Sequence, residues 1–408
     1  MNYFEAYQSC YLFGALRYFS NLENSVCLVN GPSGCSFYAR NAIINLNGYF
    51  ESLKKVKIPK IFTVDFSEED VIFGNENKLR RASTEVIEKY KPKMMFIFNC
   101  CVSEIIGVDI DSIAEELSRE YSIKVVAIHS AGFKGDHKYG MKMSGKIIAD
   151  NFFKQRPKKN NKVNILGDFD YFNRNTKELM MQLNKIGIND VLHVPGSCSL
   201  EQLQEATSAC LNIITCQNAS KNLADIMEER FAIPYIGKGY NLYGIDNCFN
   251  IYKQIYEFFD KDVQPLTNER NEWQQKIDKI KPSLKEKTAV VVAGTRRALG
   301  YSTILKELGV EIKLIFSECD KSYTSKNEFL IYSKNILVNE YFDNLSSQIE
   351  KINPDVIFTT LPEMVAPNKY LPRLSDDFSG FAGVLRFAEY LEEYFDEMMD
   401  NNIILIND

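Results

Sequence analysis

Four short apolar runs in the first 130 residues are separated by segments with helical periodicity. The runs are SVCLVNG (25–31), IFTVD (61–65), MMFIFNC (94–100) and VVAIHS (125–130). They read as strands buried on both faces, and the amphipathic segments 78–90 and 109–121 between them read as helices. Strands that alternate with helices in this way are typical of βαβ units, which build parallel sheets covered by helices.

The same pattern restarts twice along the chain. The basic, polar stretch RPKKNNK (156–162) predicts a linker, and a charged helical stretch from 268 to 281 is expected to end at Pro282. The later strand-like runs are VNILGDF (163–169), VLHVPG (191–196), LNIIT (211–215), IPYIG (233–237), AVVVAG (289–294), EIKLIFS (311–317), NILVN (335–339) and DVIFTT (355–360).

These three sets of runs predict an α/β protein with three Rossmann-like domains. Each domain is expected to be a mostly parallel sheet flanked by helices, with a ligand cavity between the domains. We place the domains at 1–160, 161–285 and 286–408, where the second carries Cys216 and the third carries the loop with Arg296.

Charge and hydropathy exclude two classes of partner. Lys and Arg number 48 against 54 Asp and Glu, a net charge of −6, whereas a general nucleic-acid binder needs a basic face. No run approaches the roughly 18 apolar residues that a membrane-spanning helix requires. The segment 1–14 carries Glu5 and no basic start, so we expect no secretory signal and a cytoplasmic protein.

The ten cysteines are spread along the chain and are expected to stay reduced in the cytoplasm. Each is then either a small buried hydrophobe or a metal or redox ligand. Ligands of α/β sheets bind at the carboxyl ends of the strands. Three of the predicted loops there contain cysteine: GPSGC (31–35), CCVSEIIG (100–107) and TCQNAS (215–220).

The segment GMKMSGKI (140–147) has the spacing of a phosphate-binding loop, but it does not fit that function. The position after Lys146 should offer a hydroxyl to magnesium, and it is Ile147. The segment also lies within a predicted helix and does not follow a strand. We therefore expect no ATP hydrolysis by this chain itself.

Two of the loop cysteines stand where thiolates are stabilised. Cys35 ends a loop with two glycines, which allow backbone amides to approach a ligand closely. Cys101 stands where a strand passes into a helix, and the N–H groups of the helix favour a thiolate. Soft thiolates select iron–sulfur clusters or zinc, and the absence of a CxxC pair argues against a compact zinc site.

Several segments resemble the nitrogenase component 1 family, which includes dinitrogenase subunits, cofactor-assembly proteins and light-independent tetrapyrrole reductases. The resemblance runs through nearly the whole chain. The segments are SCYLFGALRYFSNLENSVCLVNGPSGCSFYARN (9–41), FSEEDVIFGNENKLRRASTEVIEKYKPKMMFIFNCCVSEIIGVDIDSI (66–113), SAGFKGDHKYGMKMSGKIIAD (130–150), IITCQNASKNLADIMEERFAIPYIG (213–237) and VAGTRRALGY (292–301).

The resemblance implies a role for individual residues. Cys10, Cys35 and Cys101 would hold an iron–sulfur cluster, either [4Fe–4S] or P-cluster-like, and the register of Gly107 selects Cys101 over Cys100. Gly34, Tyr38 and Arg40 would lie beside that cluster. Cys216 would bind a second, complex metallocluster, Arg296 or its neighbour Arg297 would line the cavity, and His137 would donate protons there. The remaining cysteines are expected to be core or surface thiols: Cys27, Cys100, Cys198, Cys210, Cys248 and Cys319.

The chain departs from the dinitrogenase α subunit in two places. That subunit has a cofactor histidine just before a motif similar to DDFSGFAG (376–383), but here the preceding residues are LPRLS, and no histidine follows His193. Met141 and Lys142 stand where dinitrogenase has histidines that serve its substrate. These differences argue against dinitrogen reduction with the iron–molybdenum cofactor.

The leading hypothesis is a nitrogenase-like reductase component that passes electrons from a cluster to a second metal or substrate site. An iron–sulfur cubane usually takes four thiolates, so three predict a partner subunit, either a homologue or a second copy, in a dimer or tetramer. The resemblance also implies a separate ATP-hydrolysing iron protein. Two alternatives remain open: a non-catalytic scaffold for cofactor assembly, and a tetrapyrrole reductase subunit whose second site holds no metal. A further alternative is a small-molecule-binding α/β protein without metal.

Overall fold

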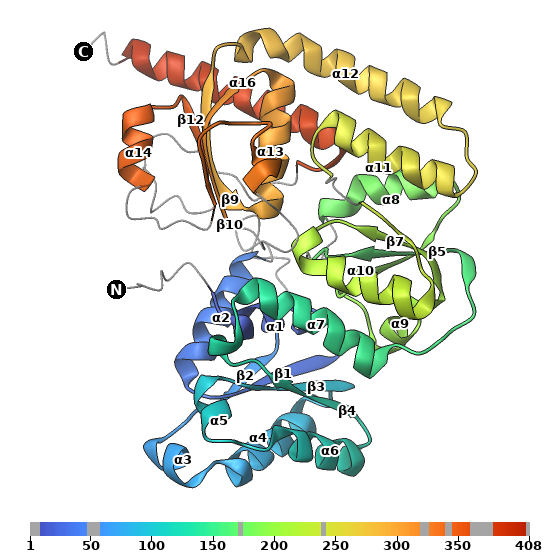
Figure 1. The fold of residues 1–408 in the computed structure, drawn as a ribbon, viewed down its shortest axis with the longest axis vertical. Coiled ribbons are helices and arrows are strands. Elements are labelled where there is room, and N and C mark those ends of the chain that lie inside the picture. The colour runs from blue at the N-terminus through green and yellow to red at the C-terminus, as the bar shows by residue number, and fades with distance from the viewer. Residues whose placement is uncertain are drawn as a thin grey trace. The chain divides into compact units, whose positions relative to one another are not determined.

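The structure is a computed structural model that describes residues 9–46, 58–169, 174–237, 242–318, 326–338, 345–359 and 378–404. Within these ranges the chain forms three four-stranded sheets flanked by helices (Figure 1), which confirms the predicted α/β class. It divides into two compact units, Met1–Asn173 with Asp190–Tyr235, and Arg174–Asn189 with Ile236–Asp408. The division into three domains stays a prediction.

The first sheet has the strand order β2-β1-β3-β4. Its strands are β1 (Ser25–Asn30), β2 (Ile61–Val64), β3 (Met94–Asn99) and β4 (Lys124–His129), and all its pairings are parallel. Side chains alternate between the two faces, as the period of a strand requires. Cys27 and Phe96 point into one core cluster, whereas Leu28 and Ile97 point into another. Both faces are buried, which explains the continuous apolar runs.

Helices cover both faces of this sheet. The expected helices appear as α4 (Glu76–Tyr90) and α6 (Ile110–Tyr121). The other elements of this region are α1 (Tyr11–Phe19), α2 (Ser33–Leu46), α3 (Glu68–Phe73), α5 (Cys101–Ile105), the 3-10 turn η1 (Gly132–Lys134) and α7 (His137–Phe152). The segment 140–147, with its phosphate-loop spacing, lies inside α7, as expected.

Helices α1 and α7 pack closely because two glycines let their backbones meet. A Cβ added to Gly14 would lie 2.0 Å from the carbonyl oxygen of His137, and one added to Gly140 would lie 2.3 Å from that of Tyr11. Helix α10 packs on α7 in turn, as Figure 1 shows. The N-terminus of α1 is thereby fixed beside the segment that leads into α7.

The second sheet has the order β6-β5-β7-β8. Its elements are β5 (Lys159–Leu166), β6 (Asp190–Val194), α9 (Leu200–Gln204), η3 (Ala206–Ser208), β7 (Ala209–Ile214), α10 (Gln217–Phe231) and β8 (Tyr235–Ile236). The linker predicted at 156–162 is wrong in its second half, because residues 159–162 already belong to β5. The polar side chains misled the prediction: Lys162 pairs with β6 in register with Asp190 and lies 3.8 Å from its carboxylate.

The third sheet lies in the second unit and has the order β11-β10-β9-β12. Its strands are β9 (Thr288–Gly294), β10 (Glu311–Glu318), β11 (Ile336–Val338) and β12 (Val356–Thr359). The helices of this unit are η2 (Arg174–Thr176), α8 (Lys177–Lys185), α11 (Ile245–Phe258), α12 (Gln264–Leu284), α13 (Thr295–Leu308), η4 (Lys326–Phe329), α14 (Leu345–Ile352) and α16 (Gly380–Ile404).

Helix α12 does not end at Pro282 as expected, since it continues to Leu284. A proline removes one backbone hydrogen bond and crowds the preceding turn, which a helix can tolerate two residues before its end. The buried side chain of Leu284 holds this last turn in place. Among the described residues, no helix combines the length and the apolar character needed to cross a bilayer.

Each sheet has one point where the strand order reverses direction. In the first sheet it lies between β1 and β3, in the second between β5 and β7, and in the third between β9 and β12. Loops at such a switch point run to opposite faces of the sheet and leave a crevice at the carboxyl ends of the strands. Ligands of open α/β sheets bind in that crevice, so these three points are where functional residues are expected.

Candidate metal centre

Three of the cysteines follow the two strands at the switch point of the first sheet. The loop after β1 carries Cys35 in the first turn of α2, and β3 is followed directly by Cys100 and Cys101. Paired residues run in parallel from Ser25 and Met94 to Asn30 and Asn99, so both strands end at the same level. The topology thus brings together two loops that are far apart in the sequence.

Cys10 reaches this place through a short antiparallel contact. It precedes α1 and pairs with Asp136, just before α7. The amide of Tyr11 donates to the carbonyl of Gly135 at 3.0 Å, and the amide of His137 donates to that of Ser9 at 2.8 Å. Cys10 is therefore fixed to the segment that connects β4 with α7.

Gly132 in that segment lies between two of the thiols. Its amide N–H donates to the Sγ of Cys101 at 3.1 Å. A Cβ added to Gly132 would lie 3.4 Å from the Sγ of Cys101 and 3.7 Å from the Sγ of Cys10. The two sulfur atoms are therefore no farther apart than the sum of these two distances. The absence of a side chain at Gly132 leaves the space between them open.

Cys100 joins the group, although sequence reasoning set it aside as a core or surface thiol. It is 2% exposed, and a Cβ added to Gly31 would lie 2.1 Å from its sulfur. Its thiolate is hydrogen-bonded by Cys35 and by Ser103, so its pKa is lowered to about 6. The pKa of Cys35 is raised, first by this hydrogen bond, then by burial and by the nearby Cys100, Cys10 and Cys101. No signal beyond the CC pair marks Cys100 in the sequence.

The four thiols suit a polynuclear iron–sulfur cluster better than a single ion. Among the described residues, no three His, Cys, Asp or Glu side chains converge as ligands of one metal ion. In a cluster each cysteine binds a different iron atom, so the thiols stand farther apart than around one ion. The donor set is soft, Gly132 offers an amide to one sulfur, and Cys10 and Cys35 are exposed on the open side. The residues present therefore fit such a group.

The other residues predicted beside the cluster lie on α2. A Cβ added to Gly34 meets nothing within 4 Å, so its backbone faces open space. Tyr38 is 76% exposed and its neighbour Phe37 is 60% exposed, whereas Arg40 is partly buried. Their place near Cys35 follows from the helix, and their contact with a cofactor stays a prediction.

Cys216 lies at the switch point of the second sheet, directly before α10. Its thiol is partly exposed, and its carbonyl accepts the hydroxyl of Ser220 at 2.6 Å. A Cβ on Gly167, which follows β5, would lie 2.7 Å from that hydroxyl oxygen. The end of β5 and the start of α10 are thus in close contact beside Cys216. Its role as a ligand stays a prediction.

Arg296 stands in the first turn of α13, after β9 at the switch point of the third sheet. Its guanidinium lies over the ring of Tyr243, 5.6 Å from the ring centre, a favourable cation–π distance. Arg297 beside it is also partly buried. Arg296 and Cys216 belong to different compact units, so a shared cavity stays a prediction.

His137 is a poor proton donor in this structure. Burial lowers its pKa to about 4, and the nearby Lys138 acts in the same direction. The Nδ1 atom is shut off from solvent, and the ring meets the edge of Phe13 at 6.3 Å between ring centres. A neutral imidazole at pH 7 has little proton to give. The predicted catalytic role gains no support from this geometry.

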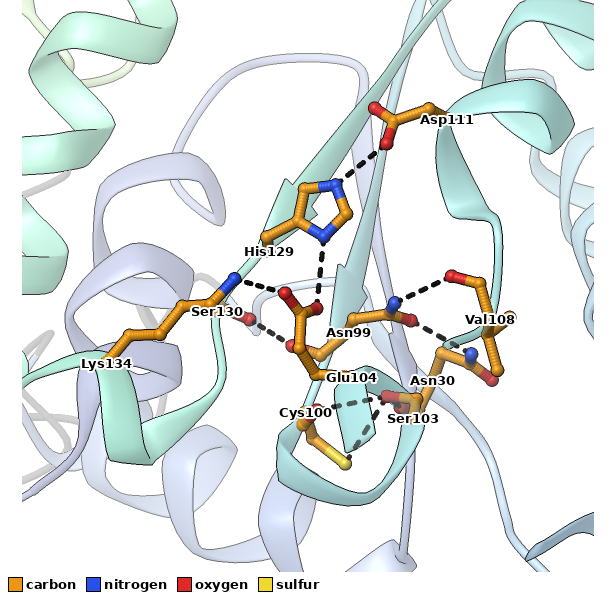
Figure 2. A network of polar contacts seen from close by, with 10 residues as sticks. All are labelled: Asn30, Asn99, Cys100, Ser103, Glu104, Val108, Asp111, His129, Ser130 and Lys134. Carbon is orange, nitrogen blue, oxygen red and sulfur yellow. Dashed lines mark hydrogen bonds and ion pairs between the residues drawn. The ribbon is translucent and has the colours of Figure 1, made fainter. Parts of the chain in front are cut away.

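Buried amides hold the loops of the cysteine site together (Figure 2). The amide of Asn30, at the end of β1, donates to that of Asn99, at the end of β3, at 3.0 Å. The carbonyl of Asn99 accepts the hydroxyl of Ser130 at 2.8 Å, and the carbonyl of Asn30 accepts that of Ser103 at 2.7 Å. Three strand ends and the start of α5 are thus joined by uncharged, buried bonds.

A charged network lies next to this amide network (Figure 2). Glu104 on α5 binds Lys134 with one carboxylate oxygen and the Nδ1 of His129 with the other, at 3.0 Å. The Nε2 of His129 lies 2.8 Å from Asp111. Both ring nitrogens face carboxylates, an arrangement that favours the protonated imidazole, in which both nitrogens donate.

The pKa values of the network follow from these contacts. Burial lowers the pKa of His129, but the bonds to Glu104 and Asp111 outweigh it, and the pKa is raised. Burial raises the pKa of Glu104, but Lys134 and His129 outweigh it, and the pKa is lowered. Sequence reasoning missed this network, because its members are separated by 25 and 30 residues and look like ordinary surface charges.

Comparison with known proteins agrees with this description of the fold. The family model described as nitrogenase component 1 type oxidoreductase matches residues 10–400. The chain belongs to this family, which confirms the resemblance drawn from the sequence segments.

Individual relatives are similar to this chain at 21–28% sequence identity. The chain is 28% identical over 328 residues to the nitrogenase iron-molybdenum cofactor biosynthesis protein NifE of Clostridium pasteurianum, covering 77% of this chain and 69% of that protein. It is 27% identical over 304 residues to the nitrogenase molybdenum-iron protein alpha chain of Methanosarcina barkeri, covering 72% and 56%. The solved structure "Nitrogenase Cp1 at pH 6.5" shares the fold, with a TM-score of 0.78, 21% identity and 95% and 88% of the two chains covered.

Proposed function

We propose that this chain is a nitrogenase-like reductase component that holds an iron–sulfur cluster through Cys10, Cys35 and Cys101 and relays electrons to a second site near Cys216. The observation that carries the proposal is the meeting of these three thiols with Cys100: Cys35 lies near the other three, and Cys101 and Cys10 lie beside Gly132. When bound, the cluster would supply one-electron transfer.

The chain's own residues have separate tasks in this function. Gly132 donates its amide to one sulfur and keeps the space between two thiols free. Asn30 and Asn99 fix the ends of the strands that carry the cysteines. Phe37 and Tyr38 follow Cys35 on α2, Phe133 follows Gly132, and all three side chains are exposed; they would exclude water when covered.

A partner subunit is the natural cover for this side. Large apolar side chains that stay exposed in one place are typical of protein contacts. A homologous subunit or a second copy would add thiolates to the same cluster, in a dimer or tetramer. An ATP-hydrolysing iron protein would deliver electrons, because the one segment with phosphate-loop spacing lies inside α7.

The second candidate is a scaffold on which a cofactor precursor is assembled. Two observations favour it: the similarity to a NifE protein, and the lack of any histidine after His193, although Cys216 is present. A scaffold would bind the same clusters and release the second one without turnover of a substrate. The tetrapyrrole alternative would leave the site at Cys216 without metal.

Anaerobic reconstitution followed by iron and sulfide analysis tests the proposal. We expect the wild-type chain to bind iron and sulfide, and Cys10→Ala to lose much of the iron. Cys27→Ala is the matched control, because Cys27 is fully buried in the core and is not expected to be a ligand. If Cys10→Ala and Cys27→Ala bind equal amounts of iron, the cluster site is elsewhere.

A second experiment separates the candidates. Cys216→Ala should lower the iron content relative to the wild type if the chain is a reductase or a scaffold, but not if it is a tetrapyrrole reductase subunit. Substrate reduction that depends on an iron protein and ATP favours the reductase. Transfer of the second cluster to an acceptor protein without such turnover favours the scaffold.

A further inference from the structure

Glu104 occupies a position between three structural elements. It belongs to α5, whose first residue is Cys101, and it binds Lys134 at the end of η1 and His129 at the end of β4. Its side chain is only 15% exposed, so these ion pairs are less screened by solvent than surface pairs. Asp111 on α6 fixes the far side of the His129 ring at 2.8 Å.

The turn that Lys134 ends is anchored on the side of α1, where the carbonyl of Gly135 accepts the amide of Tyr11 at 3.0 Å. The backbone bonds within the turn are local, from Lys134 to Ala131 at 3.0 Å and from Gly135 to Gly132 at 3.3 Å. None of its three residues is buried, and Phe133 is 61% exposed. The turn nevertheless carries Gly132, whose amide must stay aimed at the sulfur of Cys101. On the side of α5, the attachment from outside the turn is the ion pair between Lys134 and Glu104.

We propose that Glu104 is a positioning residue of the cysteine site: by binding Lys134 and His129 together, it holds the Gly132–Lys134 turn against α5 and keeps the Gly132 amide on the Cys101 sulfur. This inference rests on the proposed function and adds to it that Glu104 influences the reduction potential of the cluster. A hydrogen bond to a cysteine sulfur stabilises the reduced, more negative cluster and raises its reduction potential.

The strand end supplies the rigid side of this arrangement. His129 is the last residue of β4, which is paired with β3 along its whole length. Glu104 thus ties the short helix and the turn to the edge of a sheet. Two carboxylates face the His129 ring, Glu104 on α5 and Asp111 on α6. The other charged groups nearby are Asp109, at the start of α6, and Lys134, which binds Glu104. Because three carboxylates gather here, the contacts of Lys134 and His129 both help to keep Glu104 in place.

Two readouts test the proposal on Glu104→Gln and Lys134→Met, with Glu116→Gln as the control. Glu116 forms an exposed ion pair with Arg80 between α6 and α4, in the same unit but apart from the cysteine loops. The first readout is hydrogen exchange of the Gly132 amide in the chain without cluster. The second is the reduction potential of the reconstituted cluster, which a purely structural role would not move.

We expect exchange at Gly132 to become about tenfold faster in Glu104→Gln and Lys134→Met, since a charged hydrogen bond is lost, and to stay unchanged in Glu116→Gln. The potential of reconstituted Glu104→Gln should move to more negative values. Exchange at Gly132 equal to that of the wild type in both variants would overturn the proposal. If the wild-type chain takes up no iron or sulfide, the proposed function fails, while the exchange data still decide the positioning role.

Discussion

The backbone amide of Gly132 donates a hydrogen bond to the Sγ of Cys101 at 3.1 Å, although the two residues follow different strands. The contact exists because β3 and β4 are neighbours in the sheet and end at the same level, at Asn99 and His129. A glycine is needed at this point, since a side chain would enter the space between Cys101 and Cys10.

Gly132→Ala tests that requirement. The new Cβ would lie 3.0 Å from the Cβ of Cys10, so Cys10 must give way, and it would touch the Sγ of Cys101 at 3.4 Å. We expect a clear loss of iron after anaerobic reconstitution, with little change in the circular dichroism spectrum. Gly294→Ala is the control, because its Cβ meets nothing within 4 Å and its φ is −61°. Equal iron in the two variants would contradict the reading of Gly132 as a spacer.

Gly31→Ala tests the packing of Cys100. The added methyl group would lie 2.1 Å from the sulfur of Cys100 and 3.0 Å from its Cβ, and overpacking of this kind costs about 1–3 kcal/mol. We expect the melting temperature to fall by several degrees in the wild-type background. In a Cys100→Ala background the same change should cost less, because the sulfur is gone. A cost that is the same in both backgrounds would show that another group is displaced.

The sequence predicted the strands well because they are buried on both faces, and their apolar runs leave no other reading. Each predicted run overlaps a strand of the described structure, from β1 to β12. It could not predict the strand order, which depends on how loops cross the sheet. The switch points beside Cys35, Cys216 and Arg296 are visible only in the fold.

Two parts of the site were missed for physical reasons. Cys100 was set aside because the register of Gly107 selects its neighbour Cys101, and a cysteine beside a strand normally fills the core. Glu104, His129 and Lys134 were not connected because ion pairs between distant residues leave no periodic signal. Pro282 was overestimated as a helix stop, because a single lost backbone bond near a helix end is tolerated.

The charged network predicts a pH dependence of stability. The folded-state pKa of His129 is raised above 6.5, so its stabilising contribution is fully present below pH 6.5 and is lost as the pH rises through the folded-state pKa. The difference in melting temperature between the wild type and His129→Asn should therefore become smaller as the pH rises from 6.5 through the folded-state pKa. Lys134→Met is the control, because it breaks the other ion pair of Glu104 but keeps the imidazole, so its effect should be flat. A flat difference for His129→Asn as well would show that the ring is not charged in the fold.

The second unit offers a prediction that is independent of the cysteine site. The carboxylate of Glu178, on α8, accepts the amides of Phe381 at 2.6 Å and Ala382 at 2.9 Å and so caps α16. Burial raises the pKa of Glu178, although these hydrogen bonds act in the opposite direction. The two amides at the start of α16 hold the carboxylate in place. Glu178→Ala leaves two buried amides without an acceptor and should cost about 1–3 kcal/mol for each, whereas Glu178→Gln keeps one acceptor oxygen and should cost less. Thermal unfolding measures both, with the exposed Glu257→Ala as the control; equal losses in the three variants would rule out the capping role.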